Sequence, residues 1–412
     1  MEIANEFSLS PQGIYNPGDV AVINAIIAKN GLKWKMAPDD GSKIPDDWWS
    51  LAIEWSSEVE NKRIVKLNLE YAYLSGVLDI SALTALQAFD CPYNQLTTLN
   101  VSGLIRLERL VCDKNQLTAL DASGLPALKS LSCNSNLLTA LNVSGLTKLE
   151  KLACANNQLT ALNVSGLTAL EALNCKKNPM TMLNVSGLTK LERLDCEGNR
   201  LTSLIVSGLP ALESLTCNNN RLNVLDVSGL TNLISLDCSD NQLSKLIVHN
   251  GLSNLEKLHC KNNRLTALDV SGLTKLEMLD CFSNQLSELD VSSLTALEFL
   301  ICYSNRLTVL DVTTLTWLKY LNCSNNLLTG LDVSTLKWLE YLYCDCNQLT
   351  ELDVTASTML KELVCADNHL TVMNTTVLKE LESGSFVPKI IDLTTYNELN
   401  DKKELELKYG KI

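Results

Sequence analysis

The chain has no excess of positive charge and no long apolar run. Its 412 residues carry 47 acidic and 34 basic side chains, which gives a net charge of −13. This balance opposes binding to nucleic acid or to anionic lipid, so we exclude both as main partners. No apolar run approaches the roughly 18 residues of a membrane span, and membrane insertion is therefore not expected.

Histidine is scarce, and the cysteines lack a metal-binding spacing. The histidines are His249, His259 and His369, which lie far apart in the chain, and no C-x-x-C motif occurs. A zinc site needs convergent sulfur or nitrogen ligands, and nucleophilic catalysis needs a base beside the nucleophile. The sequence therefore predicts no enzyme, no metal and no cofactor.

What the chain does contain is a repeat of 21 residues. Cysteine recurs with this step from Cys91 (112 − 91 = 21) to Cys365, except for one step of 22 between Cys238 and Cys260, and asparagine follows each of these cysteines by three residues. The unit reads L-x-x-L-x-C-x-x-N-x-L-T-x-L-D/N-V-S-G-L-T-x. Its Leu-x-Cys segment alternates apolar and variable positions, which predicts a short strand with one buried face.

Because one such unit buries too little apolar surface to fold alone, neighbouring units must cover it. We therefore expect a solenoid with a parallel sheet on one side, turns and 3₁₀ pieces on the back, and a ladder of asparagines bonded to loop backbone groups. The cysteines of the repeat are expected to be buried, reduced thiols, with Cys346 outside the ladder. The aspartates from Asp269 to Asp353 are expected to cap turns rather than to hold calcium.

Composition divides the chain into three predicted parts. Residues 1–63 form an amino-terminal cap with a helix from about Asp19 to Lys29 and four tryptophans, which are expected to cover the apolar edge of a first strand at Ile64 to Leu69. Residues 64–378 form a solenoid of about fifteen units. Residues 379–412 form a carboxyl-terminal cap, with extended segments predicted at 386–393 and 404–409.

The repeat resembles the leucine-rich repeat family, whose pattern L-x-x-L-x-L-x-x-N/C-x-L it matches in fourteen successive copies from Leu86, with cysteine at the third apolar position. It is similar to the repeats of bacterial internalin-like surface proteins, and the cap resembles that of plant-type receptors, although it has no cysteine. The resemblance implies a leucine-rich repeat solenoid with its parallel β-sheet on the concave face, and a protein that binds rather than catalyses.

The resemblance also implies a secreted or cell-surface protein. Met1 to Pro11 has no apolar signal core, so an export signal would be absent from this chain. A cytoplasmic protein is the alternative. The sequence leaves the oligomeric state open.

A ligand is expected on the open sheet face, where large apolar side chains cluster in four consecutive repeats. The outward positions hold Met278, Phe282, Phe299, Ile301, Tyr303, Tyr320, Tyr341 and Tyr343, and Trp317 and Trp338 flank the same strands. Exposed aromatic rings offer a large contact area at low entropic cost, which predicts a binding site for a protein or glycan in adhesion or host interaction. Alternatively, the rings only stabilise the sheet, and the chain is a structural spacer or display scaffold of a larger surface protein.

Overall fold

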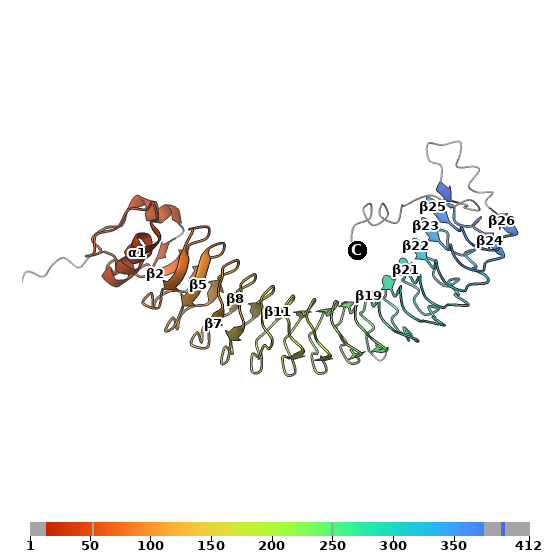
Figure 1. The fold of residues 1–412 in the computed structure, drawn as a ribbon, viewed down its shortest axis with the longest axis horizontal. Helices are drawn as coiled ribbons and strands as arrows, with labels where there is room; N and C mark the ends of the chain where they lie inside the picture. The colour runs from red at the N-terminus through yellow and green to blue at the C-terminus, as the bar shows by residue number, and fades with distance from the viewer. Residues whose placement is uncertain (1–13, 52, 249–250, 375–388, 392–412) are drawn as a thin grey trace, which may run out of the picture. The chain divides into compact units, whose positions relative to one another are not determined.

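The computed structural model describes residues 14–51, 53–248, 251–374 and 389–391, of which 49–51 and 389–391 are described by their backbone alone. The chain forms two compact units, residues 1–243 and 244–412. Each unit consists of stacked turns with short strands, and among the described residues helix occurs at the start of unit 1 (Figure 1). The predicted solenoid is confirmed. The predicted boundaries at 63 and 378 remain predictions.

The cap of unit 1 consists of helix α1 (Pro17–Asn30), the 3₁₀ helix η1 (Asp46–Leu51) and strand β1 (Glu54–Trp55). The Asn16 side chain caps the amino end of α1, and Gly31, at φ 61°, ends the helix. The prediction of a helix is therefore confirmed, with slightly wider bounds. The apolar face of α1 is buried, as its helical spacing predicts.

Asp19 holds the cap to the first strand, β2 (Ile64–Asn68), instead of capping the helix. Its carboxylate accepts two hydrogen bonds of 2.9 Å from the Arg63 guanidinium and one of 2.8 Å from the Ile64 backbone N–H. Strand β1 pairs antiparallel with β2. Strand β1 therefore covers the edge of the sheet, with the half-buried Trp55 opposite Ile64. Trp48 is buried in the cap, where its Nε1–H donates to the Lys35 carbonyl, and the covering role predicted for the tryptophans as a group remains a prediction.

The open face of unit 1 is a parallel sheet of short strands, one from each repeat, which pair in chain order. After β2 these are β4 (Ala88–Asp90), β6 (Arg109–Val111), β8 (Ser130–Ser132), β10 (Lys151–Ala153), β11 (Ala172–Asn174), β13 (Arg193–Asp195), β15 (Ser214–Thr216) and β17 (Ser235–Asp237). The back carries β3 (Ser75–Asp79), β5 (Gln95–Asn100), β7 (Ala119–Asp121), β9 (Ala140–Asn142), β12 (Met182–Asn184), β14 (Ser203–Ile205) and β16 (Val224–Asp226).

Unit 2 repeats this arrangement. Its open face consists of β19 (Lys257–His259), β20 (Met278–Asp280), β21 (Phe299–Ile301), β22 (Tyr320–Asn322), β23 (Tyr341–Tyr343), β25 (Glu362–Val364) and β27 (Lys389–Ile391), which pair in this order. Its back carries β18 (Lys245–Ile247), β24 (Glu351–Asp353) and β26 (Val372–Asn374). Strand β27 confirms part of the extended segment predicted at 386–393, whereas the segment at 404–409 lies outside the described residues.

The back of the described repeats contains turns and short strand pairs, without the 3₁₀ pieces that we predicted there. The pairs β3–β5, β7–β9 and β12–β14 are examples. They form because the Leu-x-x-Leu run after each loop is extended and meets the same run of the next repeat. The predicted turn caps are confirmed: the Asp290 carboxylate, for example, accepts hydrogen bonds from the Ser292 side chain and backbone, which lower the pKa of Asp290.

Two ladders lie inside the turns, and both were predicted. The repeat cysteines are buried and unbridged, and burial raises the pKa of thiols such as Cys112 and Cys302 well above its usual range. Each asparagine bonds to backbone groups of its own and the preceding turn. Asn284, for example, donates to the carbonyls of Cys260 and Cys281, both at 3.1 Å, and its Oδ1 accepts the Leu265 N–H at 3.0 Å.

Candidate binding surface

The eight large side chains predicted on the sheet face of unit 2 come from strands β20 to β23 and the loops after β20 and β21. Strands β21, β22 and β23 follow one another along the solenoid (Figure 1). The strands pair without a register shift, so that Met278 lies beside Phe299, Phe299 beside Tyr320, and Tyr320 beside Tyr341. The loops after β20 and β21 add Phe282 and Tyr303. We call these eight residues the aromatic surface: Met278, Phe282, Phe299, Ile301, Tyr303, Tyr320, Tyr341 and Tyr343.

The rings of the aromatic surface pack on one another across the strands. Phe282 and Tyr303 stack with their centroids 4.3 Å apart and their planes at 12°. Tyr320 contacts Phe299 at 6.4 Å, Tyr341 at 6.0 Å and Tyr343 at 5.5 Å, all with tilted rings. Such pairs contribute about 0.5 to 1.5 kcal/mol each beyond the area that they bury, so the surface is held rigid before any ligand arrives.

The expectation that these side chains are exposed is only partly correct. Tyr343 is 8% exposed and counts as buried, and the other seven are half-buried. The physical reason is the strand spacing of about 4.8 Å, at which large side chains in the same column cover one another. The surface presents ring edges and partial faces, and not freely exposed rings.

Trp317 and Trp338 form a separate stack at the amino ends of β22 and β23. Their rings lie 6.2 Å apart at 9°, and the two residues are 55% and 50% exposed. Between Trp317 and Tyr320 along the chain, Lys319 forms a 2.8 Å ion pair with Glu298. The tryptophan pair therefore flanks the aromatic surface, as predicted, beyond a line of charged side chains.

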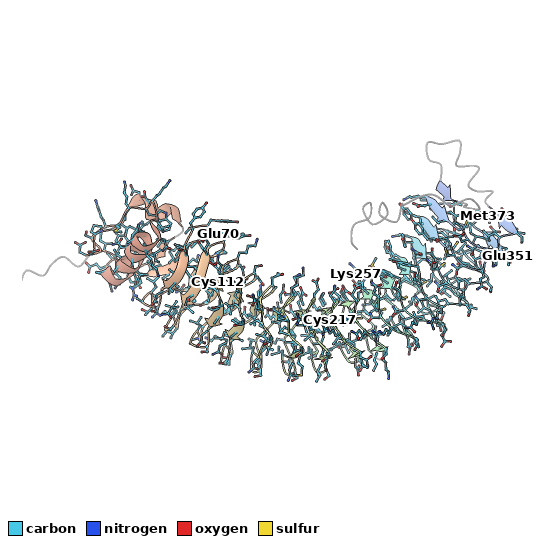
Figure 2. The ribbon with its side chains drawn as sticks, viewed as in Figure 1. Glu70, Cys112, Cys217, Lys257, Glu351 and Met373 are labelled. Carbon is cyan, nitrogen blue, oxygen red and sulfur yellow. The ribbon has the colours of Figure 1, made fainter. Side chains whose placement is uncertain are left out.

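Charged residues of opposite sign border the aromatic surface. On β19, Lys257 lies in register with Met278, and on β25, Glu362 lies in register with Tyr341. The Lys257 label in Figure 2 marks the basic border. The Lys261 ammonium lies 5.3 Å from the centre of the Phe282 ring, which is a cation–π distance.

Asp280 is a buried carboxylate at the basic border that the sequence analysis did not single out. It is 2% exposed, and its Oδ2 lies 3.5 Å from both His259 Nδ1 and Lys261 Nζ. Its Oδ1 has no hydrogen-bond partner among the described residues. From the sequence alone, an aspartate at an outward strand position is expected to be solvated. Its burial could have been predicted from its neighbours in the same column, which are the basic side chains of the preceding repeat and Ile301 of the next repeat.

Two ladder cysteines lie next to Asp280 and both are buried: Cys281 follows it in the chain, and the Cys260 N–H donates to the Asp280 carbonyl at 2.8 Å. Among the described residues, no group of three or more histidine, cysteine or acidic side chains is placed to hold a metal ion. No described helix is long and apolar enough to span a membrane.

The stacked turns, the parallel sheet and the two ladders define a leucine-rich repeat protein. A family profile for leucine-rich repeats in two copies matches residues 253–294 and 316–355. The functional domain of InlJ from Listeria monocytogenes, which includes a cysteine ladder, is 37% identical, with a TM-score of 0.69, over 76% of this chain and 71% of its own. The chain belongs to the leucine-rich repeat family.

Two further solved structures are similar. A leucine-rich repeat protein of Leptospira interrogans is 25% identical over 79% of this chain and 94% of its own, with a TM-score of 0.63. The leucine-rich effector protein YopM of Yersinia pestis is 26% identical over 75% of this chain and 79% of its own, with a TM-score of 0.56. A comparison with curated protein sequences finds no match.

Leucine-rich repeat solenoids are generally non-enzymatic modules that bind proteins on extended surfaces. The match to the functional domain of InlJ confirms the predicted similarity to internalins at the level of the repeats. The plant-receptor-like cap and the binding role of each residue in the aromatic surface remain predictions.

Proposed function

We propose that this chain is a non-enzymatic binding module that holds a protein ligand on the aromatic surface of unit 2. The observation that carries the proposal is the column of large apolar side chains in exact register on β20 to β23, with a basic strand on one side and an acidic residue on the other. An apolar centre with a charged rim is the usual composition of a protein–protein interface.

A protein fits this surface better than a glycan does. Sugar rings stack on open aromatic faces, but Phe282 and Tyr303 cover each other's faces. The half-buried rings instead form a broad, preorganised apolar area, and binding to it requires little further ordering of side chains. A structural spacer needs no such surface, and elsewhere the equivalent outward positions hold small or basic residues, such as Ser214 and Ser235 on β15 and β17 and Arg193 on β13.

The test is a double substitution, Tyr303→Ala with Tyr341→Ala, in the full chain. Proteins captured from host and bacterial surface extracts are identified, purified and titrated against the wild type and the variant. We expect the affinity to fall by at least about tenfold, because interface energy concentrates in buried aromatic anchors. The matched control is Ser214→Ala with Ser235→Ala, at equivalent positions of unit 1.

Loss of affinity with both variants still folded supports the proposal. Unchanged affinity, or a loss fully explained by unfolding, favours the spacer.

A further part of the proposal is the setting: a secreted or cell-surface protein that acts in adhesion or host interaction. It is supported by the resemblance of the repeats to internalin-like proteins.

A further inference from the structure

Three tyrosines stand exposed on the loops that follow the first two open-face strands of unit 1. Tyr71 and Tyr73 lie in the loop after β2, and Tyr93 lies in the loop after β4; they are 56%, 81% and 38% exposed. Glu70, the residue before Tyr71, marks this loop in Figure 2. We call Tyr71, Tyr73 and Tyr93, with their neighbours Glu70 and Lys114, the tyrosine platform.

The platform has a defined geometry. The rings of Tyr71 and Tyr93 stack with their centroids 4.3 Å apart and their planes at 19°. The Lys114 ammonium lies 4.3 Å from the centre of the Tyr93 ring and donates a 3.0 Å hydrogen bond to the Tyr93 hydroxyl, which lowers the pKa of that phenol. The two rings are therefore held in place, whereas Tyr73 projects into solvent.

The backbone of all three tyrosines is left-handed, with φ of 52°, 54° and 58°. The repeat imposes this conformation, because the Tyr71 and Tyr93 N–H groups donate to the carbonyls of Pro92 and Asp113 in the following turn. Left-handed backbone is unfavourable for a bulky side chain and easier for asparagine or glycine. The position of Tyr71 and Tyr93 is left-handed in the later repeats too, where it holds short residues such as Ser135 and Asn156 and also the long Lys114 and Lys177.

The left-handed backbone at Tyr71 and Tyr93 belongs to the repeat and does not by itself mark a functional site. What sets this place apart is the side chains, because Tyr71 and Tyr73 are more than half exposed and burial of apolar surface does not account for tyrosine there. The exposure of the rings makes ligand contact the function to consider.

The chemistry around the rings selects the class of ligand. Tyr93 is contacted by the Tyr71 ring and by the Lys114 ammonium, so the ring faces left for a ligand are those of Tyr73 and the face of Tyr71 that is turned away from Tyr93. Such a face can stack on the C–H face of a sugar, and the phenol hydroxyls can exchange hydrogen bonds with its hydroxyl groups.

The rim carries negative charges on Glu70 and Asp113 and a positive charge on Lys114, and the Asp113 carboxylate also accepts hydrogen bonds from the Ser132 hydroxyl and the Asn134 N–H. Because both signs of charge border the rings, a ligand whose hydroxyl groups both donate and accept hydrogen bonds fits the rim better than a ligand with charge of one sign.

We propose that the tyrosine platform binds a neutral saccharide by ring stacking on Tyr73 and on the outer face of Tyr71, with Tyr93 and Lys114 holding Tyr71 in place. An apolar protein surface at this place would have to desolvate Glu70 and Lys114 without giving them partners, whereas sugar hydroxyls supply both donors and acceptors. The site does not depend on the aromatic surface, since the two lie in different units and use different loops and strands.

The test measures binding of the full chain to immobilised tetrasaccharides of glucose, galactose, mannose and N-acetylglucosamine. The variant is the triple substitution Tyr71→Asn, Tyr73→Asn and Tyr93→Asn, because asparagine tolerates the left-handed backbone. We expect the wild type to retain at least one of the four sugars and the variant to bind it at least about tenfold more weakly. The variant should melt at the same temperature or slightly higher.

The control is Tyr303→Ala with Tyr341→Ala, which should leave sugar binding unchanged even if it abolishes protein capture. The proposal is overturned if none of the four sugars binds the wild type, if the asparagine variant binds as tightly as the wild type, or if that variant melts well below the wild type. Loss of sugar binding in the control variant instead would also overturn it, because the sugar site would then lie on unit 2.

Discussion

The aromatic surface of unit 2 and the tyrosine platform of unit 1 present the same kind of side chain in opposite ways. On unit 2 the rings of Phe299, Tyr320 and Tyr341 stand on extended strands, in register, and cover one another until they are half-buried. On unit 1 they stand on left-handed loop positions and remain open to solvent. The position within the repeat therefore decides whether an aromatic residue contributes to packing or pays a strain cost for exposure.

The largest expected effect comes from removing the contacts that join the cap of unit 1 to strand β2, the strand before the loop of Tyr71 and Tyr73. Asp19→Ala should destabilise unit 1 by about 3 to 5 kcal/mol, because it leaves the Arg63 charge and the Ile64 N–H without their buried partner. Thermal unfolding read by circular dichroism measures the loss. Glu60→Ala, at an exposed site in the same segment, should change stability by less than about 0.5 kcal/mol. Equal melting of the two variants would contradict the assigned role of Asp19.

The next effect tests whether the two regions rest on the same scaffold. Asn94→Ala removes bonds to the Leu69 and Cys91 carbonyls and to the Leu74 N–H, and Asn284→Ala removes the equivalent set under Phe282. Each should cost about 2 to 3 kcal/mol, because buried backbone groups lose their partners. Urea unfolding of both variants, with the exposed Thr266→Ala as control, gives the comparison. A cost in only one unit would show that the ladder is not uniform.

A smaller effect should differ in size between the regions. Tyr303→Ala with Tyr341→Ala should lower stability by about 1 to 2 kcal/mol, since ring contacts across strands are lost. Tyr71→Asn with Tyr93→Asn should leave the melting temperature nearly unchanged, because relief of the left-handed strain offsets the loss of the Tyr71–Tyr93 stack. Differential scanning calorimetry of the two double variants is the measurement. A fall in both would mean that the platform is also a packing device.

The smallest effect concerns the reactivity of the thiols, both that of Cys346 and those of the buried ladder in the two units. Cys346 is half-buried, and burial raises its pKa to about 11, with Asp345 and Asp367 adding to the shift. Because the thiolate is the reactive form, its alkylation should accelerate roughly tenfold per pH unit up to about pH 11. Cys112 and Cys302 should stay unlabelled in the folded chain. Mass spectrometry of the native protein after timed labelling decides this, and early labelling of one ladder cysteine would locate a unit that opens more readily.

The sequence by itself determines the repeat and everything that recurs with it. A period of 21 residues fixes which positions face inward, so the strands, the buried thiols of the ladder from Cys91 to Cys365, and the asparagine ladder from Asn94 to Asn368 follow from the pattern. The cluster of large side chains on β20 to β23 also follows, because outward positions can be counted along each unit. The cap helix was predictable from its spacing and its Asn30-Gly31 ending.

Only the tertiary structure decides what touches what between neighbouring repeats. The burial of Tyr343, the stack of Trp317 on Trp338 and the buried carboxylate of Asp280 all depend on side-chain packing across adjacent turns. The contacts of Asp19 with Arg63 and the left-handed backbone at Tyr71 likewise arise between segments separated in the sequence. A repeat pattern assigns each residue to a column, but strand spacing and ring size determine whether the neighbours in that column cover it or leave it exposed.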